Sequence, residues 1–536
     1  MAAHEQRTIP GLVGAAAADF GDATAIEEGE LRIRFRDLAE AGTTATRAFM
    51  AAGVEPGDRV AIWAPNFHEW IVAAIGLQSA GAALVPLNTR LKGAEAGYIL
   101  EKSGARLLCT VDAFLDTDYV GMLQSACGRA SDARPVAGLP ALEQIICLRG
   151  ERADCRSWDD FLGAGGSVSA EAAAERAAAV SPDDLSDILF TSGTTGQPKG
   201  VMTAHGQNLE AFAAWSDVVG LREGDRYLVV NPFFHAFGYK AGWLSALMRG
   251  ATILPQPVFD VGVVLERIAS ESISVLPGPP ALYQSILATP GFDSADLSSL
   301  RLAVTGAAVI PVELIHKMRD VLGFETVITG YGLTEACGIA TMCRYDDDPE
   351  TIATTSGRAI PGAEVRCVDD SGAEVARGEA GEVVVRGYNV MRGYLDDDAA
   401  TRETVDAEGW LHTGDVGVMD ERGYIRITDR IKDMFIMGGF NCYPAEIELI
   451  LSGHDEIAAA AVIGVPDERM GEVGMAFVVA APGASPTPES VIAWCRENMA
   501  NYKVPRHVAL IDELPLNAMN KVQKFVLRER AREILG

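Results

Sequence analysis

The 536-residue chain has no apolar run near the ~20 residues needed to span a bilayer, and its first residues lack a basic segment followed by a long apolar core. Its nine cysteines include no CxxC pair and are odd in number, so neither a zinc site nor a disulfide framework is expected. Positive charge is also scarce, since 45 Lys and Arg against 74 Asp and Glu give a formal net charge of −29. This charge repels nucleic acid and anionic lipid, so we expect no nucleic-acid partner and no stable membrane insertion. From the N-terminal residues and the cysteine spacing we expect a cytoplasmic protein with reduced cysteines.

Apolar and charged residues make up 48% and 22% of the sequence, which is typical of a chain that folds throughout, and its length exceeds one ordinary core. From about residue 10 to 350, short apolar strands alternate with helical stretches. The expected strands include RVAIWAP (59–65), AALVPL (82–87), ISVLPGPP, LRLAVTG and ETVITGYG, and EWIVAAIGLQSA is an expected helix. This alternation predicts layers of parallel α/β structure.

The amino-acid composition changes beyond Ser356, where β-branched residues and Gly or Asp turns dominate. A shorter segment with an α+β pattern follows from about Asp429. The predicted fold class is therefore α/β. We expect a large N-terminal domain, residues 1–428, made of two α/β layered subdomains and a small β-barrel-like subdomain at about 356–428. A small, mobile α+β C-terminal domain is expected over residues 429–536.

Residues 190–200, FTSGTTGQPKG, follow the expected buried strand DLSDILF (184–190). Glycines let the backbone approach a ligand closely, and the hydroxyls and a lysine suit phosphate. Pro198 before Lys199 has no N–H to donate, which disfavours an ordinary P-loop; a flexible linker is the alternative reading of this composition. The candidate phosphate-binding residues are Thr191, Ser192, Gly193, Thr194, Thr195, Gly196 and Lys199.

Five further turns are TGAA (305–308), GYGLTEACG (330–338), HTGD (412–415), DRIKDMFIMGGFNCYPAEIE (429–448) and LPLNAMNKVQK (514–524). With the loop at 190–200, they resemble the ANL superfamily of adenylate-forming enzymes, specifically acyl-CoA synthetases, over essentially the whole chain. The resemblance implies that a carboxylic acid reacts with ATP to give an acyl-adenylate and is then transferred to CoA, releasing AMP and pyrophosphate. It implies ATP, Mg²⁺ and CoA as cofactor and co-substrates; a homodimer is an option that the sequence leaves open.

The resemblance also implies roles for single residues around ATP. Lys199 acts as the electrostatic latch of a loop that closes over the β- and γ-phosphates, Tyr331 stacks on adenine, and Thr334 lies beside the α-phosphate. Glu335 resembles the carboxylate that holds Mg²⁺. Asp415 and Arg430 resemble the acceptor of the ribose hydroxyls and its cationic neighbour, and the other nucleotide-binding candidates are Gly306, Ala307, Gly330 and Gly332.

Near the C-terminus, Lys521 resembles the lysine that bridges the substrate carboxylate and the phosphate. The family usually has Gly before this lysine, and this chain has Asn520, which tolerates a left-handed backbone. Lys432 lies at the position of the family's hinge, and Gly438 and Gly439 resemble the turn at the CoA tunnel. The catalytic candidates are Lys521, Thr195, Glu335 and His235.

The segment NPFFHAFGYKAG (231–242) resembles the family's acyl gate and pocket. It lacks the Asp with which amino-acid-activating domains pair a substrate ammonium, so an acid without an α-amino group is expected. The pocket candidates are His235, Phe237, Gly238, Ala303, Ala308 and Gly332. The segments are most similar to ligases that activate the ring-derived indane propionate of steroid breakdown; a medium-chain fatty or aryl acid is the alternative, with a luciferase-like oxygenase and a non-catalytic nucleotide sensor as remote ones.

Overall fold

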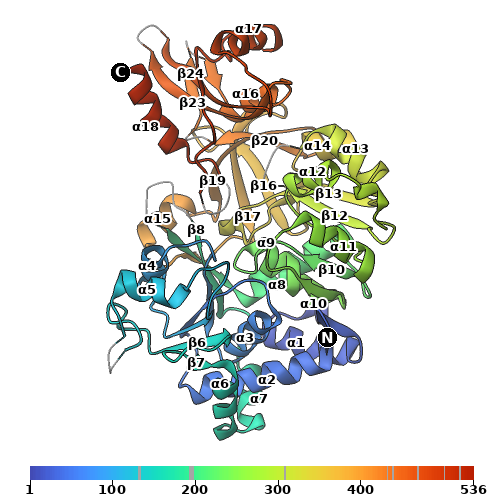
Figure 1. Cartoon of the computed structure of the whole chain (residues 1–536), viewed down its shortest axis with the longest axis vertical. Coiled ribbons are helices and arrows are strands. Elements are labelled where there is room, and N and C mark those ends of the chain that lie inside the picture. The colour runs from blue at the N-terminus through green and yellow to red at the C-terminus, as the bar shows by residue number, and fades with distance from the viewer. Residues whose placement is uncertain are drawn as a thin grey trace. The chain divides into compact units, whose positions relative to one another are not determined.

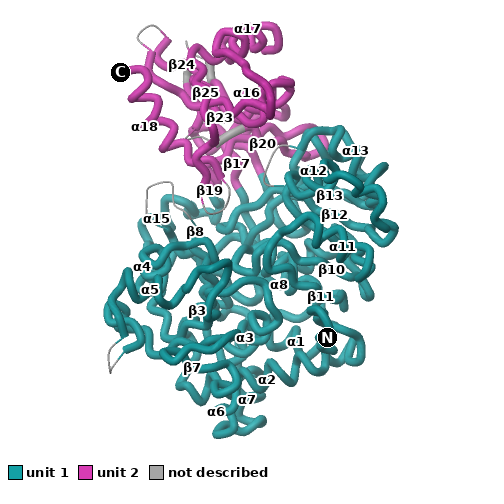
Figure 2. Tube along the Cα trace, viewed as in Figure 1, with its two compact units in different colours: residues 1–365, 385–411 teal, residues 366–384, 412–536 magenta. Residues whose placement is uncertain are grey.

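The computed structural model describes residues 1–130, 134–191, 198–306, 310–430, 433–437, 440–467, 470–499, 501–517 and 521–536. The chain forms two compact units, shown in Figure 2. Unit 1 comprises residues 1–365 and 385–411, and unit 2 comprises residues 366–384 and 412–536. Among the described residues, no helix is long and apolar enough to cross a membrane.

The largest sheet lies in unit 1 and has eight strands in the order β18-β9-β8-β4-β3-β5-β6-β7. Their bounds are β3 Arg59–Trp63, β4 Ala83–Pro86, β5 Leu107–Val111, β6 Gln144–Arg149, β7 Arg156–Ser157, β8 Leu185–Thr191, β9 Lys199–Ala204 and β18 Gly393–Tyr394. Strands β8, β4, β3, β5, β6 and β7 run parallel, whereas β9 is antiparallel to both β8 and β18. The predicted parallel layers are therefore present, and an antiparallel hairpin, β8–β9, stands at one side of them.

A second set of strands in unit 1 forms two four-stranded paths, β10-β11-β1-β2 and β12-β13-β14-β15. Their bounds are β1 Thr24–Glu28, β2 Leu31–Arg34, β10 Arg226–Val229, β11 Thr252–Pro255, β12 Leu302–Gly306, β13 Thr326–Tyr331, β14 Thr341–Met342 and β15 Arg358–Ala359. Val275 bridges both Tyr227 and Leu302. The segment ISVLPGPP does not form the regular strand that was expected. Bridges form at Val275, and Leu276 N and Gly278 N donate to the carbonyls of Leu302 and Val304, but the prolines have no N–H for a continuous ladder.

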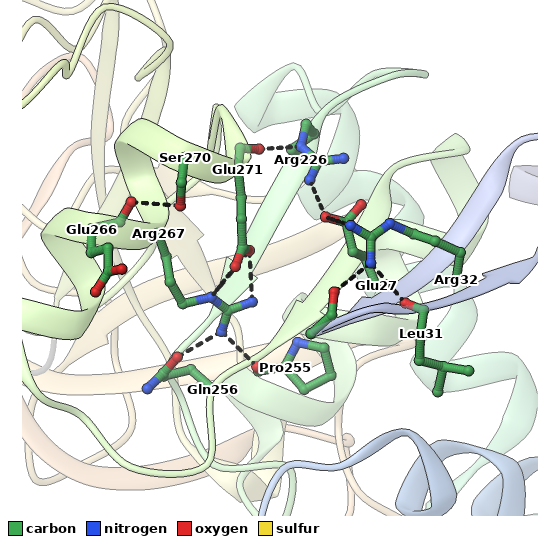
Figure 3. A network of polar contacts seen from close by, with 11 residues as sticks. Glu27, Leu31, Arg32, Arg226, Pro255, Gln256, Glu266, Arg267, Ser270 and Glu271 are labelled. Atoms are coloured by element: carbon green, nitrogen blue, oxygen red, sulfur yellow. Dashed lines mark hydrogen bonds and ion pairs between the residues drawn. The ribbon is translucent and has the colours of Figure 1, made fainter.

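Polar contacts fasten β1 to β10 and to the helix α11, Val261–Glu271 (Figure 3). The buried Glu27 carboxylate lies 2.8 Å from both the Arg32 and the Arg226 guanidinium groups. Arg226 also donates to the Glu271 carbonyl, while the Glu271 carboxylate accepts from Arg267 at 2.8 Å. A buried carboxylate is tolerated when it is paired in this way, so the network ties β1, β10 and α11 together.

Helices α1, α2 and α3 pack against one another in unit 1 (Figure 1). Helix α3, His68–Ser79, is buried on nearly all sides, in keeping with its apolar sequence EWIVAAIGLQS. A Cβ at Gly76 would lie 2.5 Å from the Ala45 Cβ in α2, and a Cβ at Gly42 would lie 2.6 Å from the Ile75 Cγ2. These two glycines therefore allow the axes of α2 and α3 to approach closely.

The α-helices of unit 1 cover these sheets and connect their strands. They are α1 Ile9–Phe20, α2 Phe35–Ala51, α3, α4 Gly93–Ser103, α5 Tyr119–Cys127, α6 Trp158–Ala164, α7 Ala170–Ala178, α8 His205–Val219, α9 Ala236–Gly238, α10 Ser245–Arg249, α11, α12 Pro280–Ala288, α13 Val312–Asp320, α14 Pro349–Thr354 and α15 Asp398–Thr404. Short 3₁₀ turns are η1 Ala3–Glu5, η2 Gly165–Ser167, η4 Phe292–Ser294 and η5 Thr334–Ala336, and η3, Tyr239–Leu244, is a π-helix.

Unit 2 contains most of the four-stranded sheet β16-β17-β19-β20 and a five-stranded sheet, β22-β21-β24-β23 with β25 beside β24. The bounds are β16 Ala363–Val368, β17 Ala380–Gly387, β19 Leu411–Met419, β20 Ile425–Arg430, β21 Phe435–Met437, β22 Phe440–Cys442, β23 Ile457–Asp467, β24 Gly471–Ala480 and β25 His507–Leu510. Helices α16 Pro444–Leu451, α17 Pro488–Asn498 and α18 Lys524–Leu535 complete it. Its core includes Phe435, Ile447, Val462, Phe477 and Leu527.

The predicted α/β fold class is confirmed, with the β-rich stretch and the smaller α+β segment in the expected order. All nine cysteines lie within the described residues and are free thiols, as the scattered spacing indicates. The compact units reflect packing density and do not test the predicted domain boundary at residues 428 and 429, which stays a prediction.

Candidate active site

The hairpin β8–β9 carries the predicted phosphate loop at its tip. Thr191 ends β8 and Lys199 begins β9, and the two residues pair across the ladder. The Tyr98 hydroxyl, from α4, donates to the Pro198 carbonyl at 3.2 Å and supports the returning side of the loop. The loop candidates between them lie outside the described residues, namely Ser192, Gly193, Thr194, Thr195 and Gly196, so their roles stay predictions.

Tyr394 links two of the predicted ATP-site residues, Lys199 and Glu335. Its hydroxyl donates to Glu335 Oε1 at 2.9 Å, and the Lys199 ammonium lies 4.9 Å from the centroid of its ring. Burial, together with the neighbouring Glu335 carboxylate, raises the pKa of the Tyr394 phenol, so the phenol stays protonated and donates. No motif in the sequence marks Tyr394, which follows a glycine in GYL, because its contacts depend on the pairing between β18 and β9.

The turn that carries Glu335 is tightly built. The Glu335 backbone carbonyl accepts a hydrogen bond from Met391 N at 2.8 Å, and Cys337, after η5, has a φ of +55°. A Cβ at Gly332 would lie 2.2 Å from the Gly338 carbonyl oxygen, so only glycine fits there. A left-handed non-glycine residue is strained and persists where its surroundings hold it, which here fixes the direction of the Glu335 side chain.

Gly306 is the last residue of β12, and Gly330 is the last but one of β13, the parallel strand beside it. They pair across β12 and β13, and a Cβ at Gly306 would lie 2.9 Å from the Gly330 carbonyl oxygen. Tyr331 is the last residue of β13, and Ala303 is buried within β12. Ligands of open α/β sheets bind beyond the carboxyl ends of such strands, which is where the predicted nucleotide residues gather; Ala307 and Ala308 lie outside the described residues.

The predicted acyl segment packs against the Glu335 turn. His235 is exposed and caps α9, since its Nδ1 accepts from Phe237 N at 3.2 Å. A Cβ at Gly238 would lie 2.1 Å from the Pro232 carbonyl oxygen, and a Cβ at Gly338 would lie 2.9 Å from the Ala236 Cβ. These contacts explain the glycines and the histidine structurally, and the roles of His235, Phe237 and Gly238 in a pocket stay predictions.

In unit 2, the HTGD turn is held by Glu382, which is not among the residues predicted from the sequence. Glu382, in β17, accepts from Gly414 N at 3.1 Å, and its other oxygen lies 2.8 Å from His412 Nδ1. Asp415 is buried in β19, and its backbone pairs with that of Arg430 in β20 across the ladder; the roles of both residues at the ribose stay predictions. No local signal marks Glu382, because it meets the turn only through the pairing of β17 with β19.

Lys521 is exposed and lies in a closed loop of unit 2. Its backbone N–H donates to Asn517 Oδ1 at 2.9 Å, and Asn517 N donates to the Lys521 carbonyl at 2.8 Å. The neighbouring Asn520, the expected hinge Lys432 and the expected CoA turn, Gly438 and Gly439, lie outside the described residues. Their roles, like that of Lys521, stay predictions.

Glu28, His68 and Glu69 are the one group of three potential metal ligands among the residues that the structure describes, with ligand atoms within 4.8 Å of one another. The Arg149 guanidinium lies 2.5 Å from Glu28 and 2.6 Å from Glu69, so both carboxylates are already paired. Burial alone would raise the pKa of Glu28, but hydrogen bonds from His68 and Arg149 lower it to about 2. This group is a structural ion-pair network.

Lys199, Tyr394 and Glu335 lie together on an α/β frame, the kind of frame on which nucleotide-using enzymes bind ligands beyond the carboxyl ends of parallel strands. The chain belongs to the AMP-binding enzyme family, whose model matches residues 13–395, and the AMP-binding enzyme C-terminal domain matches residues 446–521. The predicted membership of the ANL superfamily is thereby confirmed.

Two relatives are named 3-[(3aS,4S,7aS)-7a-methyl-1,5-dioxo-octahydro-1H-inden-4-yl]propanoyl:CoA ligase. The chain is 49% identical over 527 residues to the one from Rhodococcus jostii, and 50% identical over 526 residues to the one from Mycobacterium tuberculosis, in each case across 98% of this chain and 99% of the relative. The solved anthranilate CoA ligase AuaEII in complex with anthranoyl-AMP superposes with a TM-score of 0.87 at 28% identity, covering 100% of both chains. The α/β fold and the class of acid–CoA ligase, as predicted, are confirmed.

Proposed function

We propose that this acid–CoA ligase activates 3-(7a-methyl-1,5-dioxo-octahydro-1H-inden-4-yl)propanoate. A carboxylate oxygen attacks the α-phosphorus of ATP and pyrophosphate leaves; the CoA sulfur then attacks the acyl carbon, AMP leaves, and the thiol proton passes to solvent. The observation that carries the substrate is the 49–50% identity, over 98% of the chain, to two ligases that bear this acid in their names. Fold kinship alone does not decide a substrate, whereas likeness at this level across the whole chain supports it.

The phosphate side of the site has groups that fit Mg²⁺. Glu335 offers a hard carboxylate, its Oε1 is held by Tyr394, and within the described residues its Oε2 makes no hydrogen bond. We assign Mg²⁺ to this carboxylate; when bound with ATP, the ion neutralises charge on the phosphates. Lys199 supplies a second positive charge nearby, and Thr195 a hydroxyl.

The other proposed roles follow the family pattern on this chain's residues. Tyr331 and Thr334 contact the adenine and the α-phosphate, and Asp415 with Arg430 receives the ribose hydroxyls. Lys521 stabilises the charge that crowds between the carboxylate and the phosphate, Lys432 is the hinge, and Gly438 with Gly439 borders the CoA thiol arm. The further nucleotide contacts are Thr191, Ser192, Gly193, Thr194, Gly196, Gly306, Ala307, Gly330 and Gly332.

On the acyl side we assign His235, Phe237, Gly238, Ala303, Ala308 and Gly332. Two observations support this side: the His235 turn packs against the Glu335 turn, and the Phe237 ring meets Trp215 edge-on with centroids 6.4 Å apart. A cytoplasmic location, and a homodimer as one option, stay predictions.

A panel of acids tests the substrate. Purified enzyme is assayed for CoA-dependent release of AMP and pyrophosphate with the bicyclic propanoate, octanoate and ferulate. We expect kcat/KM for the bicyclic acid to exceed the others by roughly 10²-fold, since a shaped pocket distinguishes ring systems strongly. A higher kcat/KM for octanoate or ferulate would contradict the proposed substrate but not the assignment to the acid–CoA ligases. ADP and phosphate as products would contradict the proposed mechanism.

A further inference from the structure

A lysine and an aspartate form a fully buried ion pair behind the acyl segment. The side chains of Lys240 and Asp187 are both 0% exposed, and Lys240 Nζ lies 3.0 Å from Asp187 Oδ1. The ammonium also donates to Thr203 Oγ1 at 3.1 Å. Asp187 Oδ2 accepts from Ser186 Oγ at 2.7 Å and from Asn208 Nδ2 at 2.6 Å. Both charges are thus held by directed hydrogen bonds, without which neither would remain buried.

Stability alone does not account for this pair. Removing two charges from water costs free energy that their attraction often fails to recover, and paired charges of this kind can be replaced by apolar groups without loss of stability. An ion pair does favour one arrangement of its groups, since one ammonium satisfies a defined set of acceptors in a single geometry. A buried pair therefore suits a task of fixing the register between two segments.

One side of the pair belongs to the base of the phosphate hairpin. Asp187 in β8 pairs with Thr203 in β9 across the ladder, and both contact Lys240. The hairpin runs from this point to Thr191 and Lys199, four residues further along each strand. At ~3.3 Å per residue, the ammonium is therefore anchored about 13 Å below the loop that meets ATP.

The other side of the pair belongs to the acyl segment. Lys240 lies in the π-helix η3, a local form that often marks a functional site. Tyr239 N donates to the carbonyl of the exposed His235 at 2.9 Å, and the Tyr239 hydroxyl accepts from Gln78 of α3 at 2.8 Å. The Tyr239 ring stacks on Trp243 with centroids 5.1 Å apart. Within five residues the chain passes from an exposed turn to a fixed, buried anchor.

We propose that Lys240 is a positioning residue for acid recognition. Through Asp187 and Thr203 it fixes the His235–Gly238 turn on the β8–β9 hairpin, so that the acid and ATP are held in a fixed position relative to each other. This inference rests on the proposed function, because it takes that turn as the acyl side. It predicts that loss of the pair changes the use of the acid while the use of ATP stays nearly as it was.

The test removes both charges together. Lys240→Met alone leaves a buried carboxylate without its cation, so we expect it to melt at a lower temperature than the wild type. The double variant Lys240→Met/Asp187→Asn keeps the shape and removes both charges, and the Ser186 and Thr203 hydroxyls can rotate to satisfy the amide, so its melting temperature should return close to wild type. In this double variant we expect KM for the bicyclic acid to rise ~10-fold, and KM for ATP to change less than ~3-fold.

A matched control pair of charges lies at the amino ends of β10 and β12, the ends opposite to the proposed site. Arg301 precedes β12 and Asp225 precedes β10, and they are joined at 2.5 Å with side chains 11% and 4% exposed. Arg301→Met/Asp225→Asn should leave both KM values unchanged. An unchanged acid KM in the Lys240 double variant, or equal rises for acid and ATP, would overturn the positioning role. Wild-type enzyme that turns over none of the acids would instead contradict the proposed function.

Discussion

Tyr394 touches both a cation and a carboxylate of the proposed ATP site with different parts of one side chain. Its hydroxyl reaches Glu335, and its ring lies beneath the Lys199 ammonium. A single residue in β18 therefore orients groups contributed by β9 and by the turn after β13. Because only the hydroxyl donates to the carboxylate, the two contacts can be separated by substitution.

Tyr394→Phe removes the donor to Glu335 and keeps the ring beside Lys199. A hydrogen bond to a charged group contributes about 1.5 kcal/mol or more, so the dissociation constant of Mg·ATP should rise about tenfold. Calorimetric titration with Mg·ATP measures this directly, without turnover. Tyr388→Phe is the control, because its hydroxyl donates only an ordinary bond to the Pro361 carbonyl at 2.9 Å. Equal affinities in wild type and Tyr394→Phe would contradict the role.

His205 gives the fold a pH dependence that is independent of the site. Its ring is buried at the start of α8, where Nδ1 accepts from Ile9 N at 3.3 Å, and burial lowers its pKa from the ordinary 6.5 to about 4. Between these values the unfolded chain binds the proton and the folded chain does not, so the free energy of unfolding falls as pH falls. The two pKa values correspond to about 3 kcal/mol in total.

We therefore expect the melting temperature of the wild type to decline from pH 6.5 toward pH 4.5, and that of His205→Gln to decline less. The lowered pKa of Glu28 acts in a separate window, below its ordinary 4.5, so the two effects can be separated. The slope of melting temperature against pH is the measurement, since the variant also loses packing. Parallel slopes for the two proteins would show that His205 is not the titrating group.

At the scale of elements, two glycines in helical backbone have opposite surroundings. A Cβ at Gly238, in α9, would lie 2.1 Å from the Pro232 carbonyl oxygen and 2.3 Å from that of Asn231. A Cβ at Gly14, in the exposed part of α1, would meet nothing within 4 Å. The same substitution should therefore destabilise one helix and stabilise the other.

Gly238→Ala should lower the free energy of unfolding by about 3 kcal/mol, because backbone oxygens cannot move aside as side chains can. Gly14→Ala should raise it by about 1 kcal/mol through helix propensity. Denaturant titration followed by circular dichroism gives both values under one condition. If Gly238→Ala were as stable as the wild type, the turn that carries His235 would have to be more adaptable than its contacts indicate.

How far the sequence predicts these elements depends on whether their signals are local. The apolar run of α3 was predicted because its pattern lies within a single segment, and so was the smaller α+β stretch after about residue 429. The strand over ISVLPGPP was wrong, since prolines interrupt the ladder. Glu335 and Lys199 were named as candidates from motifs, whereas Tyr394, Glu382 and the Lys240–Asp187 pair were not named. Each of these depends on contacts between segments far apart in the chain.

At the scale of the whole molecule, the net charge of −29 opposes the binding of ATP and CoA, which are both anions. Positive groups must therefore act at short range, where screening is weakest. Lys199 is such a group in unit 1, and Lys521 is the predicted one in unit 2. Lys524, three residues further along the chain, has its ammonium 3.0 Å from the Glu448 carboxylate.

Lys521→Ala should separate the two half-reactions. The proposed ammonium stabilises charge present only while the acid attacks ATP, so its removal should slow acid-dependent pyrophosphate release by roughly 10²–10³-fold. Thioester formation from pre-made acyl-adenylate and CoA should stay within about threefold of wild type, because that step no longer crowds the same negative charge. Lys524→Ala is the matched control and should leave both steps near wild type, since it removes only the partner of Glu448. If Lys521→Ala slowed both half-reactions equally, or neither, Lys521 would be a surface lysine and another cation would have to serve the first step.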